Sequence, residues 1–255
     1  MIDYRSKKMI VCDMDGTLVP SKLSPDTQMS DLIERLLLQY SFAVISGASI
    51  ELFSERFLSR LTLTEQQSQN LYLLPSIGAG MYILENNYTK KIYEELLTTS
   101  EFQHISAVVL QAAKLLHLVP AEQFGPTLEM RGTSATYSAL GQDAPFDLKT
   151  QWDMDQKKRQ ELLAIIVPQL PDFNIAIGGL TSIDITRAGI DKAYGITKLS
   201  EYTKIPVSDM LYVGDALYEN GNDYAVYKTG VDCLPVKTVA ETKQLFRDLL
   251  TISLF

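Results

Sequence analysis

The chain has 255 residues, of which 46% are hydrophobic and 21% are charged, and its formal net charge is −8. This length suits one large domain or two smaller ones, and the composition is that of an ordinary globular protein. The negative charge argues against a nucleic-acid or anionic-membrane partner, and no apolar run is long enough to span a membrane.

The first predicted strand is the apolar run 9–12, which leads into a motif beginning Asp13-Met14-Asp15-Gly16. Residues two apart on a strand point to the same side, so Asp13 and Asp15 can face one small site. Two carboxylates held so close repel each other unless a cation or a shared proton relieves them. Mg²⁺ suits such a site because it prefers hard oxygen ligands and phosphate-bearing substrates. The alternative is an ordinary turn, since an Asp-Gly pair often follows a strand.

Helix and strand patterns alternate over the following segment. Apolar residues at helical spacing predict a helix that contains Leu32 and Leu36 and a second helix over 50–61. Strands are predicted over 42–45 and 71–74. This alternation predicts βαβ units around a parallel sheet.

Ser46 and Gly47 follow the second predicted strand. The Ser46 hydroxyl and the backbone amides of the Gly47 turn can bind phosphate oxygens. An N-cap for the next helix, formed by Ser46 or Ser49, is an equally good interpretation of the same segment.

The alternation stops near residue 85, and a different order of elements follows. Helices are predicted over 101–117 and 154–166, and strands over 127–130, 134–139, 173–177 and 182–185. This mixture predicts an inserted α+β domain, residues 86–188, within a core formed by residues 1–85 and 189–255. The basic run Lys157-Lys158-Arg159 is expected on a solvated helix face.

The core pattern resumes with a helix over 190–201, a strand over 210–213 and a final helix over 238–250. Lys192 lies near the start of the first of these helices, where the helix dipole opposes its charge. This placement favours an ammonium group that points at a bound anion, although a solvated surface lysine is the common alternative.

Acidic residues also follow the last core strand, at Asp215 and at Asn222-Asp223. In an open parallel sheet, ligands bind beyond the carboxyl ends of the strands, so these side chains are expected near Asp13. Carboxylates that hold a metal, a cation aimed at an anion and a spare carboxylate together predict phosphoryl transfer through an aspartyl-phosphate.

The two cysteines, Cys12 and Cys233, are far apart in the sequence and give no sign of a disulfide framework. The basic residues near the N-terminus precede an apolar stretch that Asp13 interrupts after a few residues, so no signal peptide is predicted. We therefore expect a cytoplasmic protein.

The four segments resemble, in order, the four motifs of the haloacid dehalogenase-like (HAD) superfamily. Asp13-Met14-Asp15-Gly16-Thr17 is similar to the first motif, Ser46 to the second, Lys192 to the third, and Asp215 with Asn222-Asp223 to the fourth. The resemblance implies an α/β fold, in which a doubly wound, Rossmann-like parallel sheet carries an inserted α+β cap domain. The insertion resembles the C2B cap of subfamily IIB, which includes Cof-type sugar phosphatases and eukaryotic-type phosphomannomutases.

The resemblance also implies roles for the core residues. Asp13 would be the nucleophile, Asp15 the acid/base, and Lys192 the cation that neutralises the charge shared with the phosphoryl group. The implied phosphate-binding residues are Ser46, Gly47, Lys192 and Asn222. Mg²⁺ would be held by Asp13, the backbone carbonyl of Asp15, Asp215 and Asp223.

In the inserted domain, two segments resemble the phosphomannomutase cap: the one ending in Arg131 and the one from Gly178 to Asp184. The implied substrate-binding residues of the cap are Arg131, Gln142, Ser182, Asp184 and Arg187. The mutases carry an arginine where this chain has Gln142, and glutamine lacks a charged bidentate fork for a second phosphate.

We therefore expect a Mg²⁺-dependent phosphatase that hydrolyses a sugar phosphate or a similar small phosphomonoester. One alternative is a hexose-phosphate mutase of the phosphomannomutase type, and another is a non-catalytic binding module. The expected partner is a small phosphorylated substrate, with no nucleic acid or membrane, and the chain is expected to be a monomer or a cap-mediated homodimer.

Overall fold

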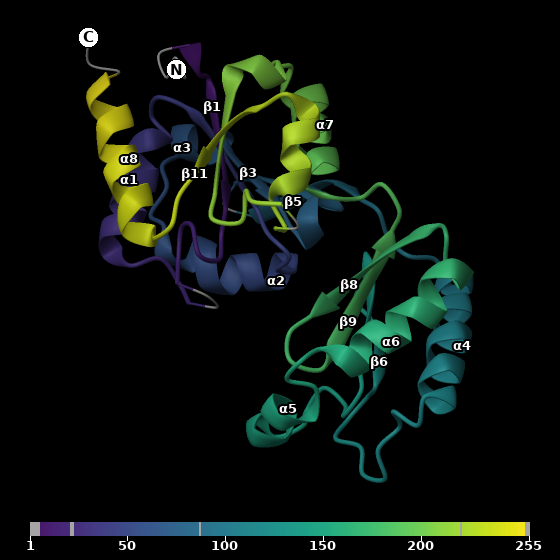
Figure 1. The fold of residues 1–255 in the computed structure, drawn as a ribbon. Coiled ribbons are helices and arrows are strands. Elements are labelled where there is room, and N and C mark those ends of the chain that lie inside the picture. Colours follow the sequence, from purple (N-terminus) through teal and green to yellow (C-terminus); the bar gives the residue numbers. More distant parts are fainter. Residues whose placement is uncertain (1–5, 21–22, 87, 220, 253–255) are drawn as a thin grey trace. The chain divides into compact units, whose positions relative to one another are not determined.

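The computed structural model describes residues 6–20, 23–86, 88–219 and 221–252 (Figure 1). The chain forms two compact units, a core unit of Met1–Glu94 with Asp191–Phe255 and an inserted unit of Glu95–Ile190. Within the described residues, no helix has the length and apolar character needed to cross a membrane.

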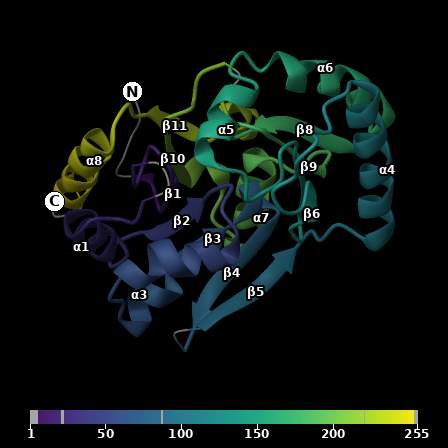
Figure 2. The same cartoon turned by 90° about the horizontal axis from the view of Figure 1, so that it is seen from below.

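The core unit is built on one seven-stranded sheet with the order β11-β10-β1-β2-β3-β4-β5 (Figure 2). The first five strands in this order are parallel, and the β4–β5 hairpin continues the sheet in antiparallel fashion. The strands are β1 (Met9–Asp13), β2 (Ser41–Ile45), β3 (Leu71–Leu74), β4 (Gly80–Glu85), β5 (Tyr88–Glu94), β10 (Met210–Gly214) and β11 (Asp232–Pro235).

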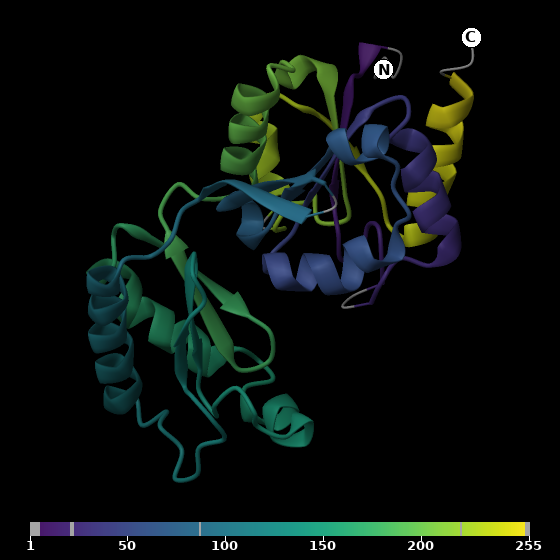
Figure 3. The same cartoon turned by 180° about the vertical axis from the view of Figure 1, so that it is seen from behind.

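Helices cover both faces of this sheet, which explains why all five residues of β1 are buried. Helices α1 (Thr27–Leu36) and α8 (Val239–Ile252) lie side by side on one face, and α7 (Lys192–Thr203) lies on the other (Figures 1 and 3). Alternate residues of β1 therefore join different apolar clusters, Ile10 on the α1 and α8 face and Val11 on the α7 face. The predicted α/β class with a doubly wound sheet is confirmed.

Helix α7 packs closely against the turn after β3, at the carboxyl end of the sheet, because two glycines face each other. A Cβ on Gly195 would lie 3.0 Å from the Cα of Gly78 and 2.7 Å from Cδ1 of Ile45. A Cβ on Gly78, where φ is +93°, would lie 2.7 Å from the Cα of Gly195. The missing side chains thus bring the first turn of α7 against the carboxyl end of the sheet.

The observed boundaries of the inserted unit differ from those predicted. The sequence pattern placed its start at residue 86, but β4 and β5 belong to the core sheet, so the core unit continues to Glu94. At the other end the unit extends to Ile190, two residues beyond the predicted boundary. The antiparallel hairpin ended the βαβ alternation without ending the sheet.

The inserted unit contains a four-stranded antiparallel sheet with the order β6-β7-β9-β8, with α4 (Thr99–Leu115) and α6 (Lys157–Ile166) packed on one face (Figures 1 and 3). Its strands are β6 (Leu128–Met130), β7 (Ser134–Ser138), β8 (Phe173–Gly178) and β9 (Ser182–Arg187). Ala135 and Ile183 point into the apolar core under the helices. By strand alternation, Thr136 and Asp184 point to the opposite, polar face.

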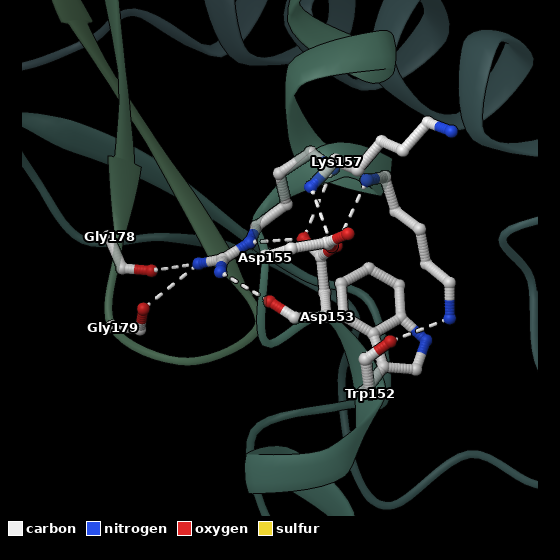
Figure 4. Close-up of polar contacts among 8 residues, drawn as sticks. Trp152, Asp153, Asp155, Lys157, Gly178 and Gly179 are labelled. Atoms are coloured by element: carbon white, nitrogen blue, oxygen red, sulfur yellow. Dashed lines mark hydrogen bonds and ion pairs between the residues drawn. The ribbon is translucent and has the colours of Figure 1, made fainter.

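Near the start of α6, Arg159 forms a buried ion pair with Asp153 and also donates hydrogen bonds to the end of β8 and the turn that follows it (Figure 4). Arg159 is 2% exposed, and its Nε donates to Oδ2 of Asp153 at 2.8 Å. Its Nη1 donates to the carbonyl oxygens of Gly178 at 3.0 Å and Gly179 at 2.9 Å. The expectation of a solvated face is therefore wrong for Arg159, whose neighbour Lys157 is exposed as predicted.

Candidate active site

Asp13 and Lys192 meet at the carboxyl end of the core sheet. Asp13 is the last residue of β1 and is 4% exposed, and Lys192 is the first residue of α7 and is 1% exposed. The Lys192 Nζ donates to Oδ1 of Asp13 at 2.5 Å and to Oδ1 of Asp223 at 2.6 Å. Three segments that are far apart in the sequence thus converge through one ammonium group, as predicted for Asp13 and Lys192.

Asp223 is fully buried and accepts hydrogen bonds at both oxygens. Besides Lys192, its Oδ1 accepts from the hydroxyl of Tyr212 at 2.5 Å, and its Oδ2 accepts from the backbone N–H of Ala216 at 3.0 Å. Burial, followed by the charges of Asp223 and Asp13, raises the pKa of Tyr212 well above its usual value, so this hydroxyl keeps its proton. These contacts fix the carboxylate of Asp223 in one orientation.

Asp215 directly follows β10 and lies against the loop after β1. The Oγ1 of Thr17 donates to its Oδ1 at 3.4 Å. Gly16 has a φ of +86°, and a Cβ there would lie 2.3 Å from Oδ2 of Asp215. The glycine of the first motif is therefore required both by its backbone conformation and by the close approach of this carboxylate.

The acidic side chains form a group that suits a divalent cation. One carboxylate oxygen from each of Asp13, Asp215 and Asp223 lies within 4.8 Å of the other two. Burial is the main cause that raises the pKa of Asp13 to about 6; the charges of Asp223 and Asp215 add to it, and Lys192 opposes it. Burial and Asp223 also raise the pKa of Asp215. Clustered hard oxygens that resist ionisation without a cation fit Mg²⁺.

The hydrogen-bond donors around Asp223 indicate a different role in metal binding from that of Asp13 and Asp215. Since Asp223 already accepts three hydrogen bonds from the protein, it fits a supporting place beside the ion, with Asp13 and Asp215 as the direct ligands. The side chain of Asp15 is not part of the metal-binding group found among the described residues. The contribution of its backbone carbonyl to the metal site and its acid/base role both stay predictions.

The segment after β2 contains two serines, and the structure shows a helix-capping contact for one of them, Ser49. Ser49 caps α2 (Ile50–Leu52), accepting from the N–H of Leu52 at 3.5 Å. Ser46 is buried, and its Oγ accepts from the N–H of Ala48 at 3.2 Å. Ser46 directly follows Ile45, which pairs with Asp13 in the sheet. Ser46 and Asp13 therefore lie at the ends of adjacent strands. The phosphate-binding roles of Ser46, Gly47 and Asn222 stay predictions.

A protein-family model for haloacid dehalogenase-like hydrolases matches residues 10–226. The chain belongs to this family. Several curated relatives are phosphomannomutases: the one from Schizosaccharomyces pombe is 23% identical over 94% of this chain and 95% of its own length. Phosphomannomutase 1 from Mus musculus is 22% identical over 88% of this chain and 85% of its own length. The likeness is thus to the phosphomannomutase-like branch of subfamily IIB.

Solved structures share the HAD fold at lower sequence identity. The IMP-nucleotidase of Plasmodium falciparum matches with a TM-score of 0.71 and 15% identity, covering 99% of this chain and 65% of that one. A haloacid dehalogenase-like hydrolase from Bacteroides thetaiotaomicron matches with a TM-score of 0.65 and 15% identity, covering 96% and 99%. These likenesses confirm the fold and carry no information about substrate.

In the inserted unit of this HAD protein, Ser182 and Asp184 lie on the polar face of β9. Asp184 accepts a hydrogen bond from Oγ1 of Thr136 at 2.8 Å, which orients its carboxylate. Arg131 follows β6, and its Nη2 lies 3.0 Å from Glu129, with about half of the side chain exposed. The substrate-binding roles of these residues stay predictions.

Arg187 has extensive contacts within its own unit. Its Nε and Nη2 each donate to Glu101 at 2.8 Å, and its Nη2 also donates to the carbonyl oxygen of Leu96 at 2.7 Å. Glu101 belongs to the capping box of α4, formed with Thr98. The guanidinium therefore anchors the start of this helix, and the predicted substrate contact would have to compete with these bonds.

Gln142 has a cation beside it that the sequence did not single out. The Nζ of Lys149 donates to the backbone carbonyl oxygen of Gln142 at 2.7 Å. The Nε2 of Gln142 is buried and has no hydrogen-bond partner among the described residues. Lys149, seven residues downstream of Gln142, gave no motif that could have identified it. Tyr212 could have been found, because a buried tyrosine in an apolar strand needs a partner for its hydroxyl.

Proposed function

We propose that this protein is a Mg²⁺-dependent phosphotransferase that takes the phosphoryl group of a sugar phosphate onto Asp13. The observation that carries the proposal is the buried contact of Lys192 with both Asp13 and Asp223, beside a third carboxylate at Asp215. A nucleophilic carboxylate, a fixed cation and a metal-binding oxygen set are the parts that phosphoryl transfer requires.

In this mechanism, an oxygen of Asp13 attacks phosphorus in line with the bond to the sugar oxygen. The P–O bond to the sugar breaks, and Asp15 donates its proton to the leaving oxygen. Lys192 neutralises negative charge on Asp13 and on the phosphoryl oxygens, and Ser46 donates a hydrogen bond to one of them. Bound Mg²⁺ would supply further neutralisation of the phosphoryl charge.

We further propose that the second step is transfer of the phosphoryl group from Asp13 to a free hydroxyl of a hexose monophosphate, which forms a hexose bisphosphate, as in a hexose-phosphate mutase of the phosphomannomutase type. The full-length curated relatives favour this alternative over the phosphatase first expected. The resemblance of the segments around Arg131, Ser182 and Asp184 to the phosphomannomutase cap also supports the mutase. Lys149 supplies one positive charge next to Gln142, where the mutases carry an arginine.

The second candidate is hydrolysis of the aspartyl-phosphate by water, which Gln142 favours. A mutase must hold the far phosphate of a bisphosphate intermediate on its cap, and a neutral amide with one lysine is a weaker clamp than an arginine fork. In either case we propose that the inserted unit binds the sugar part of the substrate.

The test is a coupled isomerisation assay with mannose 1-phosphate and glucose 1,6-bisphosphate as activator, run beside a phosphate-release assay on the same mixture. We expect Mg²⁺-dependent isomerisation that exceeds phosphate release, and EDTA should abolish both. Phosphate release without isomerisation would favour the phosphatase. Asp13→Asn should abolish both reactions while leaving the unfolding midpoint near that of wild type; retained turnover would refute nucleophilic attack by Asp13.

A further inference from the structure

Tyr212 is the central residue of β10 and places a hydroxyl group behind the nucleophile. It pairs with Val11 in the parallel register, and its side chain joins the apolar cluster on the α7 face of the sheet. Asp13 follows Val11 by two residues and so points to the same face. Tyr212 is fully buried, and its hydroxyl donates to Oδ1 of Asp223 at 2.5 Å.

The oxygen that accepts from Tyr212 also accepts from Lys192. The Nζ of Lys192 donates to this Oδ1 at 2.6 Å and to Oδ1 of Asp13 at 2.5 Å. A continuous path of hydrogen bonds therefore runs from the Tyr212 hydroxyl through Asp223 and Lys192 to the nucleophile. Hydrogen bonds to ionised groups are stronger than neutral ones, and neighbouring bonds in such a path reinforce one another.

The backbone next to Tyr212 leaves space for this arrangement. A Cβ on Gly214 would lie 2.4 Å from Oδ2 of Asp223 and 2.9 Å from Cε1 of Tyr212. The absence of a side chain at 214 thus lets the carboxylate and the phenol ring pack together. If the hydroxyl were missing, Oδ1 of Asp223 would keep Lys192 as its one donor among these contacts, and the N–H of Ala216 would hold the other oxygen, Oδ2.

We infer that Tyr212 is a positioning residue. Its hydroxyl holds Asp223 in place, and Asp223 in turn keeps the ammonium group of Lys192 beside the nucleophilic oxygen of Asp13 and the phosphoryl oxygens. Tyr212 contacts neither substrate nor phosphorus and acts through Asp223. The inference rests on phosphoryl transfer to Asp13, as proposed above, and adds a requirement that none of the four motifs contains.

The first test replaces the hydroxyl alone, with Tyr212→Phe, and uses beryllofluoride with Mg²⁺ as a mimic of the phosphorylated aspartate. Isothermal titration calorimetry should show about tenfold weaker binding of beryllofluoride in the variant, the size expected for one lost hydrogen bond to a charged group. In the isomerisation assay, kcat should fall about tenfold while KM stays within about twofold, because the ground-state contacts to sugar are untouched.

The matched control is Tyr137→Phe, which removes a hydroxyl from a buried tyrosine of the inserted unit. It should leave beryllofluoride affinity and kcat within about twofold of wild type. Unfolding midpoints of both variants separate a general loss of stability from a local effect. A Tyr212→Phe protein with wild-type affinity and kcat, or one that loses only stability, would overturn the inference.

A double-mutant cycle with Asp223→Ala tests whether Tyr212 acts through Asp223. In that background, Tyr212→Phe should change beryllofluoride affinity by less than about twofold; a full tenfold loss in both backgrounds would refute the proposed path. Lys192→Met provides a second background if Asp223→Ala does not fold. Because binding of beryllofluoride needs no sugar, failure of isomerisation would leave this inference standing. A wild-type protein that does not bind beryllofluoride would remove the site on which both proposals rest.

Discussion

Lys192 is held between two carboxylates at the start of a helix whose dipole opposes its charge. Burial acts to lower its pKa, but the charges and hydrogen bonds of Asp13 and Asp223 outweigh burial, so the pKa is raised. The ammonium therefore stays charged throughout the neutral range. The site thus contains a permanent cation and three acids whose charge a metal ion would balance.

The raised pKa of Asp13 links metal binding to pH. Burial, with the neighbouring acids, raises this pKa from 3.8 to about 6. In the metal-free protein this group therefore weakens the folded state as the pH rises from 3.8 to about 6, because the folded state binds the proton more tightly. A cation beside Asp13 offsets that effect.

Mg²⁺ affinity should therefore fall at low pH, since a proton on Asp13 competes with the ion. We expect the Kd for Mg²⁺ to rise about tenfold for each pH unit below 6 and to change little between pH 7 and 8. Calorimetric titrations with Mg²⁺ at pH 5, 6 and 7.5 measure this directly. Asp13→Asn should flatten the profile, and equal Kd values at pH 5 and 7.5 in wild type would contradict the assigned ligand.

The residues of the site were easier to predict from the sequence than the residues and strands that support it. Asp13, Lys192 and Asp215 were predictable because each lies at the end of an apolar strand or start of a helix, and parallel strands bring such ends together. Arg159 was not, because its burial depends on Asp153 and on carbonyls almost twenty residues away. The β4–β5 hairpin was missed because the antiparallel pair lacks the helix that marks a βαβ unit.

The ion pair of Arg159 should matter for both stability and substrate binding. Arg159→Met leaves Asp153 as a buried, unpaired charge and frees the turn that precedes Ser182, so we expect a loss of about 3 kcal/mol in the free energy of unfolding. Urea denaturation of the variant measures this loss. KM for the sugar phosphate should rise more than kcat falls.

The control for this prediction is Lys157→Met, two residues away on the exposed side of the same helix. It should change stability by less than about 0.5 kcal/mol. If both variants behave alike, the buried pair does not hold the β8–β9 turn.

Each unit has its own apolar core, and all the residues proposed to take part in phosphoryl transfer belong to the core unit. The inserted unit, Glu95–Ile190, contributes no strand to the core sheet among the described residues. On the proposed division of roles, substitutions in the core unit should alter phosphoryl transfer, and substitutions in the inserted unit should alter binding of the sugar.

Two separate cores predict two thermal transitions. Mg²⁺ with beryllofluoride should raise the midpoint of the transition that belongs to the core unit, because ligands stabilise only the part that binds them. The other transition should stay within about 1 °C, and differential scanning calorimetry resolves the two. Arg159→Met should lower only the ligand-insensitive transition. A single transition that moves as a whole would show that the units unfold together.

The facing glycines at 78 and 195 have a consequence for how the ammonium group of Lys192 reaches Asp13. A lysine side chain has a limited reach. The separation between α7 and the sheet therefore decides whether Nζ can contact Asp13. That separation is set in the first turn of the helix, where Gly195 of α7 packs against Gly78 in the turn after β3. The position of the ammonium beside Asp13 therefore depends on a contact between two glycines that carry no functional group of their own.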